Sequence, residues 1–251
     1  MNCELPISAL LAGSSIPNSQ FIIHNFNATL PPMPALHQLA AGAFQRAQAR
    51  FRRQRMERFA RRFGIGETTT ILDIGGLPAT WTALFPTPRV TLLNLFSALH
   101  LAGRGGLPWV LADACQLPCA DRSFDIVFSN SVIEHLGTAE RQRQFAQEVM
   151  RAGRGFFIQT PDRAFPLEQH LWMPFVHWLP KRIAKAMVEK FTVWEWVVRP
   201  GGPERRFYLS HCLDDVRLLN GRELVEMFPG AIIQRERWLG LPKSLIAWKL
   251  P

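Results

Sequence analysis

Five short apolar segments between Thr69 and Gln159 constrain the fold more than any other feature of this sequence. Each has the length of a β-strand, and apolar residues occupy both alternating faces instead of one. Strands with two apolar faces belong to parallel sheets that helices cover on both sides. The series therefore predicts an α/β fold around a mostly parallel sheet. Its members are Thr69–Ile74, Arg89–Leu93, Trp109–Ala112, Phe124–Ser129 and Gly155–Gln159.

The segments beyond these strands complete the predicted sheet and its cover. Thr138–Arg151 and Asn220–Phe228 have the pattern of capped amphipathic helices. Ala231–Trp238 and Ser244–Lys249 are two further strands, and Gly240-Leu241-Pro242 between them predicts a tight turn. We therefore expect a Rossmann-like, seven-stranded, mostly parallel sheet that ends in an antiparallel hairpin at its edge.

The rest of the chain predicts an organisation in two parts, residues 1–64 and residues 65–251. The first part is an extended arm followed by a helical pattern that ends at Gly64. The second is the α/β domain. Within it, residues from about 160 to 212 are rich in Pro and Trp and lose the regular alternation, so we interpret them as an inserted lid after the fifth strand.

A dense group of arginines accounts for much of the net charge of +9. The group lies in one predicted helix, and such a run is typically a solvated helix face. A basic helix can also bind nucleic acid. A non-catalytic or nucleic-acid-associated module that uses the helix over residues 43–63 is therefore the alternative function. The arginines are Arg46, Arg50, Arg52, Arg53, Arg55, Arg58, Arg61 and Arg62.

Other sequence features narrow the class of protein. The four cysteines, Cys3, Cys115, Cys119 and Cys212, suit neither a disulfide framework nor the spacing of a metal site, so we predict no metal. The short apolar run over residues 7–12 has no basic segment before it, which argues against a secretory signal. No apolar stretch is long enough to span a bilayer. These features predict a cytoplasmic protein.

Small or polar residues follow four consecutive predicted strands. Ligands of open α/β sheets bind beyond the carboxyl ends of the strands. Glycines there let the backbone approach a ligand, and a carboxylate beside them can accept from an ammonium group. Each residue type is also common in ordinary turns and caps, but together the set suits an adenosyl amino acid. The residues are Asp73, Gly75, Gly76, Asn94, Asp113, Ala114, Asn130 and Ser131.

The amino-acid sequence of these segments also resembles that of a known family. ILDIGG, then LLN, then ADACQLPCADRSFDIVFSNSVIEHL resembles the class I S-adenosylmethionine-dependent methyltransferases of the small-molecule group. The resemblance extends over about residues 65–165. QTPDRAFPLEQHLWMPFVHWLP and the C-terminal FPGAIIQRERWLGLPKSLIAWKL resemble the insertion and the final hairpin of a bacterial subset of the family. A dinucleotide-dependent dehydrogenase would instead require a full G-x-G-x-x-G, which is missing here.

The resemblance implies S-adenosylmethionine as cofactor and a role for each strand end. Asp73, Gly75 and Gly76 would surround the methionine part, and Asn94 would lie at the ribose. Asp113 and Ala114 would hold the adenine, and Asn130 and Ser131 would line the floor under the sulfonium. Two departures predict weaker cofactor binding. Asn94 stands where the family usually has a carboxylate, and Pro78 stands where a further glycine is usual.

The predicted reaction is methyl transfer to a small-molecule or glycan-type acceptor, with oxygen as the expected target. Transfer from a sulfonium is an in-line displacement, so the protein mainly aligns the acceptor and excludes water. A base is useful only if the acceptor must lose a proton. His135 and His170 are the candidate bases; a bond of His135 to backbone, or a packing role for His170 beside Glu168, is the alternative for each.

The predicted lid carries aromatic and basic side chains together. Trp172, Phe175 and Trp178 are interpreted first as packing within the lid. The second interpretation is peripheral contact with a membrane, because an amphipathic segment that carries Trp and Lys can lie at a lipid interface. The basic residues beside the aromatic ones are Lys181, Arg182, Lys185 and Lys190.

Overall fold

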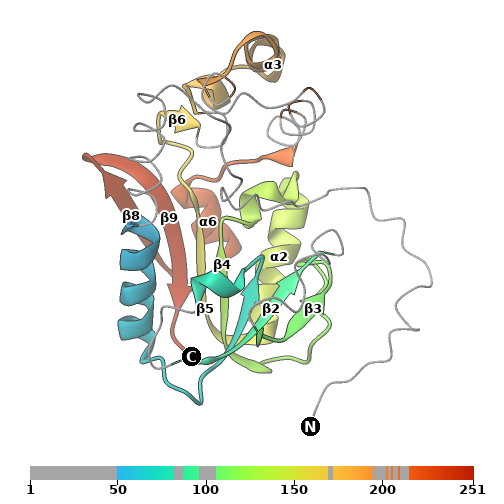
Figure 1. Ribbon diagram of the computed structural model, residues 1–251, viewed down its shortest axis with the longest axis vertical. Helices are drawn as coiled ribbons and strands as arrows, with labels where there is room; N and C mark the ends of the chain where they lie inside the picture. Colours follow the sequence, from blue (N-terminus) through green and yellow to red (C-terminus); the bar gives the residue numbers. More distant parts are fainter. Residues whose placement is uncertain are drawn as a thin grey trace, which may run out of the picture.

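A computed structural model of the chain describes residues 50–81, 87–95, 106–168, 172–193, 195, 202, 205, 209 and 215–251. Its centre is a seven-stranded sheet with the strand order β3-β2-β1-β4-β5-β9-β8 (Figure 1). The strands are β1 (Thr70–Ile74), β2 (Arg89–Asn94), β3 (Trp109–Leu111), β4 (Phe124–Asn130), β5 (Gly153–Pro161), β8 (Ile232–Trp238) and β9 (Leu241–Lys249).

The strand directions confirm the predicted fold class. β1 pairs in parallel with both β2 and β4, and the pairs β2–β3 and β4–β5 are parallel as well. β9 is antiparallel to both of its neighbours, β5 and β8. The sheet is therefore Rossmann-like and mostly parallel, and the C-terminal hairpin lies at its edge. The order of strands reverses between β1 and β4, which is where open α/β sheets bind ligands.

The turn of that hairpin is shorter than the sequence suggested. Leu239 and Gly240 both have positive φ angles, of 49° and 80°, as a two-residue hairpin turn requires. Trp238 therefore pairs directly with Leu241, and Pro242 pairs with Arg237. The prediction that Leu241 and Pro242 belong to the turn is wrong, because two residues suffice to reverse the chain and β9 begins at Leu241.

Helices cover the two faces of the sheet and bury a core on each side. α2 (Ala139–Ala152) and α6 (Gly221–Met227) pack Phe145, Val149 and Leu224 against one face. Thr138 caps α2, as predicted, by accepting a hydrogen bond from the backbone N–H of Arg141 (3.2 Å). α6 begins with a capping box between Asn220 and Glu223. These local signals explain why both helices begin where the sequence indicated.

The helix over residues 50–63 covers the opposite face of the sheet. Phe59 is fully buried there, and its ring centroid lies 5.0 to 6.2 Å from the ring centroids of four aromatic residues. Tilted and edge-to-face rings at such distances add to the free energy gained by burial. The helix is thereby fixed on the sheet, in front of β1, β4 and β5. The four residues are Phe63, Trp81, Phe128 and Phe157.

The chain leaves the sheet after β5 and forms a smaller unit. It contains β6 (Leu167–Glu168), β7 (Met173–Pro174), the 3₁₀ turn η6 (Val176–Trp178) and α3 (Lys181–Lys190). A separate small core joins α3 to this unit through Ala184 and Val188. The interpretation of residues 160–212 as a lid stays a prediction, and His170 lies outside the described residues. In the described part of the chain, no helix has the length and apolar character needed to cross a membrane.

Candidate functional site

The predicted cofactor residues gather at one edge of the sheet, because the strands that carry them are parallel neighbours. Ile74 at the end of β1 pairs with Leu93 of β2 and with Ser129 of β4. Asn94 ends β2, and Asn130 ends β4 opposite Gln159 of β5. The structure therefore brings the four strand ends together as the sequence predicted. The contacts of the side chains define what each can do.

Asp73 lies at the end of β1 beneath the glycine loop. Its carboxylate is 1% exposed, and Oδ2 accepts a hydrogen bond from the indole N–H of Trp81 (2.7 Å). Oδ1 is also buried and has no hydrogen-bond partner among the described residues. A Cβ atom on Gly76 would lie 1.7 Å from Oδ2, so only glycine fits over this carboxylate. Gly75 adopts a φ of 75°, which also favours glycine.

Burial determines the protonation of Asp73. Desolvation raises the pKa of its carboxyl group from 3.8 to about 8, and the hydrogen bond from Trp81 opposes this rise only in part. The carboxyl group therefore keeps its proton at neutral pH unless a cation approaches. An ammonium group bound at Oδ1 would favour the ionised form. The orphaned oxygen thus fits the amino group of an amino-acid ligand.

The glycine loop and the end of β2 are joined through Asn94. The side chain of Asn94 is buried, and its Nδ2 donates to the carbonyl oxygen of Gly76 (3.0 Å). The backbone N–H of Gly75 donates to the carbonyl oxygen of Leu93 (2.7 Å). After the loop, Pro78 opens the short 3₁₀ turn η2 (Pro78–Thr80) that leads to Trp81. Pro78 therefore helps to place the indole that holds Asp73.

Asp113 follows β3 and has two kinds of partner. Its Oδ1 accepts from the backbone N–H of Cys115 (2.9 Å), as in a local Asx turn. Nη2 of Arg141, on α2, reaches both carboxylate oxygens at 2.9 and 2.8 Å. The sequence did not predict the ion pair with Arg141. Ala114 beside it is buried in the core.

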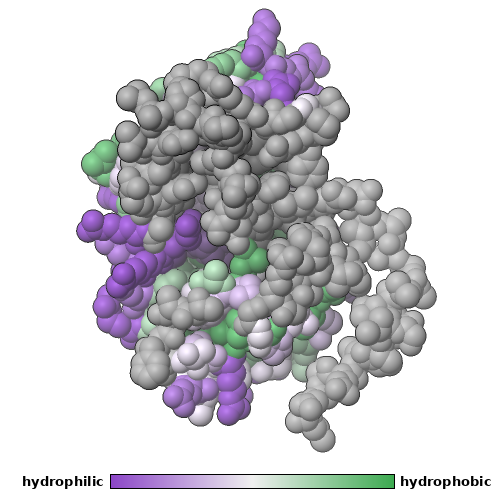
Figure 2. All heavy atoms as spheres, viewed as in Figure 1, coloured by the Kyte–Doolittle hydropathy of each residue, from purple (hydrophilic) through white to green (hydrophobic). Residues whose placement is uncertain are grey.

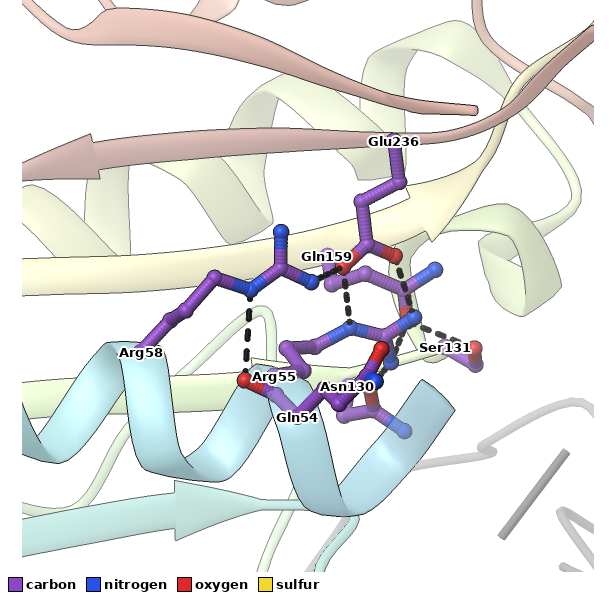
Figure 3. Close-up of polar contacts among 7 residues, drawn as sticks. All are labelled: Gln54, Arg55, Arg58, Asn130, Ser131, Gln159 and Glu236. Atoms are coloured by element: carbon purple, nitrogen blue, oxygen red, sulfur yellow. Dashed lines mark hydrogen bonds and ion pairs between the residues drawn. The ribbon is translucent and has the colours of Figure 1, made fainter. Parts of the chain in front are cut away.

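Asn130 ends β4 and Ser131 follows it, and both belong to a partly buried polar network, which Figure 3 shows. The hydroxyl group of Ser131 donates to Oε1 of Gln159 (3.0 Å), and its backbone N–H donates to the carbonyl oxygen of Gln159 (3.0 Å). Ser131 has a φ of 60°, a strained value for a residue with a side chain. Such strain persists where surrounding contacts fix the backbone, and it is common at functional sites.

Arg55, on the helix over residues 50–63, is the centre of this network. Its guanidinium donates to Oδ1 of Asn130 and to Oε1 of Gln159 (3.1 Å). It also forms an ion pair with Glu236 of β8, with Nη2 and Oε2 2.6 Å apart. Arg58 binds the other oxygen of Glu236 at 2.6 Å (Figure 3). The helix thereby fixes the side chain of Asn130 at the end of β4.

The interpretation of the arginine-rich helix as a solvated face holds for Arg50, Arg52, Arg53 and Arg61, which are exposed, but not for Arg55 and Arg58. Arg55 is 5% exposed, and Arg58 also points onto the sheet. Arg62 donates to Gln234 (2.7 Å) and stacks on the ring of Trp248. The helical period places these three residues three or four apart, on the face that packs against β8 and β9. The run of arginines was a visible signal, but the partners of these three residues on β8 lie more than 170 positions away in sequence.

Lys243, near the start of β9, adds a further cation at this corner. Its ammonium group lies 4.0 Å from the ring centroid of Phe51. Burial and the positive charge of Arg55 lower the pKa of Lys243 to about 8, although the negative charge of Glu236 opposes them. The carboxyl ends of β4 and β5 are therefore bordered by positive charge.

Of the two candidate bases, only His135 lies within the described residues. His135 lies half-buried in the 3₁₀ turn η5 (Ile133–Leu136), and its backbone N–H donates to Val132. His170 is outside the described residues. Glu134, next to His135, is fully buried and accepts from the hydroxyl group of Thr160 (3.0 Å). Glu134 thus ties η5 to β5, directly behind the strand ends.

Comparison with known proteins identifies the class. Residues 72–155, from within β1 to within β5, match the family described as a methyltransferase domain. No curated protein matches the chain. Together with the strand order, the family match defines a class I S-adenosylmethionine-dependent methyltransferase domain. The match covers about a third of the chain and identifies that part as a methyltransferase domain, an enzyme domain whose cofactor is S-adenosylmethionine.

Solved structures are similar to the chain at low identity. An S-adenosylmethionine-dependent methyltransferase from Aquifex aeolicus is 14% identical, over 76% of this chain and 88% of that one, with a TM-score of 0.44. A Nostoc punctiforme protein named for O-methyltransferases is 12% identical, over 78% of this chain, with a TM-score of 0.46. A Rhodobacter sphaeroides structure named for zinc-dependent alcohol dehydrogenases is 14% identical, over 73% and 84% of the two chains, with a TM-score of 0.47. The chain covers 55% of the Nostoc protein's length.

Proposed function

We propose that the chain transfers a methyl group from S-adenosylmethionine to a small-molecule or glycan-type acceptor, with oxygen as the target atom. The observation that carries the proposal is the buried, unpartnered Oδ1 of Asp73 beneath two glycines, at the carboxyl end of β1. A buried carboxylate oxygen without a partner costs free energy unless a ligand completes it. The ammonium group of an amino-acid cofactor is a suitable partner.

The other strand ends support the same orientation of the cofactor. Gly75 and Gly76 would leave room for its methionine part, and Asn94 would lie beside its ribose. Asp113 and Ala114 would hold its adenine, although Asp113 then shares its carboxylate with Arg141. Asn130 and Ser131 would form the floor beneath the sulfonium, where Arg55 and Gln159 hold them in place.

When bound, S-adenosylmethionine supplies the methyl group in an already activated, electrophilic form. The chain's residues then have to position the acceptor in line and keep water away. Several buried groups at the ends of β4 and β5 have fixed side-chain partners, which favours such alignment. His135 and His170 are the residues we propose for proton removal, if the acceptor loses a proton on transfer.

Calorimetric titration with S-adenosylhomocysteine tests the proposal. We expect saturable binding to the wild-type chain. Asp113→Ala should weaken binding by about 1.5–3 kcal/mol, because a charge-assisted hydrogen bond is lost. Asp121→Ala is a matched control, since Asp121 is 76% exposed and also pairs with an arginine. Absence of binding at millimolar ligand would end the proposal, and equal losses in both variants would remove the role of Asp113.

A further inference from the structure

One end of the molecule carries apolar side chains that its own core does not cover. Five large apolar residues on and beside η6 and α3 are each 42 to 52% exposed. α3 lies at the end toward which the parallel strands run (Figure 1), so the exposed residues are beyond the site edge of the sheet. The residues are Phe175, Trp178, Ile183, Met187 and Phe191, and we call them the α3 patch.

α3 buries only one side of its apolar face. Ala184 and Val188, four positions apart, are buried in the small core. Ile183 and Met187 each come one position earlier, so at about 100° per residue they continue the same apolar face on its other side. That side is exposed, at 51% for Ile183 and 42% for Met187. Part of the apolar face of α3 is therefore available to a partner.

The one polar group on the aromatic rings of the α3 patch, the indole N–H of Trp178, already has a hydrogen-bond partner. The indole N–H of Trp178 donates to the carbonyl oxygen of Arg163 (2.8 Å), while the side chain remains half-exposed. Its ring lies 5.3 Å from that of Phe175, which has a φ of 62°. Because the N–H group already has a partner, the ring can enter an apolar medium without leaving a donor unpaired.

An excess of positive charge lies beside the α3 patch. α3 carries four exposed cations and a single acid, Glu189. Within the described residues, none of these four cations forms an ion pair. The unpaired cations are Lys181, Arg182, Lys185 and Lys190.

We propose that the α3 patch docks the protein on an anionic membrane surface, with its apolar side chains in the headgroup region and the cations at the lipid phosphates. Exposed apolar area beside unpaired lysines is what a monotopic helix uses at such a surface. A two-fold contact between copies would bring the like charges of two α3 helices together, which disfavours a second copy as the occupant. Figure 2 shows apolar and strongly polar side chains side by side at this end of the molecule.

Vesicle flotation of the full chain tests the docking surface. The probes are vesicles of phosphatidylcholine alone and of phosphatidylcholine with phosphatidylglycerol in a 7:3 ratio. We expect binding only to the anionic vesicles, and weaker binding as salt is raised. Lys181→Gln with Lys185→Gln should lower the partition coefficient by about fivefold per charge removed. Equal binding to both vesicle types would overturn the proposal.

The second part of the vesicle experiment tests the apolar side chains. The double variant Ile183→Glu, Met187→Glu should reduce the partition coefficient onto anionic vesicles at least tenfold. The matched control is Val225→Glu with Ile232→Glu, because these residues on α6 and β8 are 55% and 54% exposed. The control should bind vesicles like the wild type. Thermal unfolding and S-adenosylhomocysteine binding should be unchanged in both variants, which separates this result from the proposed function.

Two outcomes of this second part would contradict membrane docking. One is undiminished vesicle binding by the Ile183→Glu, Met187→Glu variant. The other is a concentration-dependent dimer of the wild type, measured by sedimentation without lipid, that disappears in the same variant. That second result would assign the α3 patch to contact between two copies of the chain.

Discussion

Two arginines hold proposed cofactor residues at the same edge of the sheet, but in opposite environments. Arg55 binds Asn130 and Glu236 from the helix over residues 50–63, and the side chains of the Arg55–Glu236 pair are 6% and 2% exposed. Arg141 binds Asp113 from α2, and these side chains are 38% and 23% exposed. Water weakens the second ion pair far more than the first.

The two corners of the proposed site therefore differ in how firmly their polar side chains are held. At the ends of β4 and β5, Arg55 contacts Gln159 and Glu236, which are buried, and Asn130, which is partly buried, so the polar groups of the proposed floor have protein partners before any ligand arrives. At the end of β3, Asp113 can exchange part of its contact with Arg141 for a ligand at small cost. We therefore expect mutations of the first pair to affect stability, and mutations of the second to affect binding.

The largest effect is expected for Arg55→Met. The change leaves Glu236 buried with only Arg58 as partner and removes the donor to Asn130 and Gln159. Loss of one member of a buried pair should lower the free energy of unfolding by about 3 kcal/mol, measured by urea titration. Arg53→Met is the control, because Arg53 is 83% exposed on the same helix, and a similar loss there would refute the role of burial.

A double variant tests whether Arg55 and Glu236 act as a buried pair. Arg55→Met combined with Glu236→Leu replaces the buried pair by apolar groups, and such replacements are often neutral or stabilising. The double variant should therefore be more stable than Arg55→Met alone, by about 2 kcal/mol in the same urea titration. Losses that simply add would show that the two side chains act independently.

A smaller effect is expected for Arg141→Met. The pair with Asp113 is partly exposed, so its loss should change the free energy of unfolding by less than about 1 kcal/mol. Affinity for S-adenosylhomocysteine should stay equal or increase, because both oxygens of Asp113 become available. A loss of stability as large as that of Arg55→Met would remove the contrast between the two corners.

Some of these features could be predicted from the sequence, and others could not. The strands, the caps at Thr138 and Asn220, and the gathering of polar residues at the strand ends follow from local patterns, and the structure confirms these elements. Arg55 and Glu236 are 181 positions apart, so no local pattern connects them. Trp81 was equally invisible as a partner of Asp73, because a donor eight positions away depends on the path of the loop between them.

The most direct measurement is the pH dependence of S-adenosylhomocysteine binding. Asp73 keeps its proton below its pKa of about 8, and an approaching ammonium group must displace that proton. Affinity should therefore rise with pH by up to about tenfold per unit between pH 5.5 and 7.5. Calorimetry at pH 7 in buffers of different ionisation enthalpy should show release of about one proton per ligand. Asp73→Asn should abolish both effects, and pH-independent binding without proton release would contradict a cofactor site at Asp73.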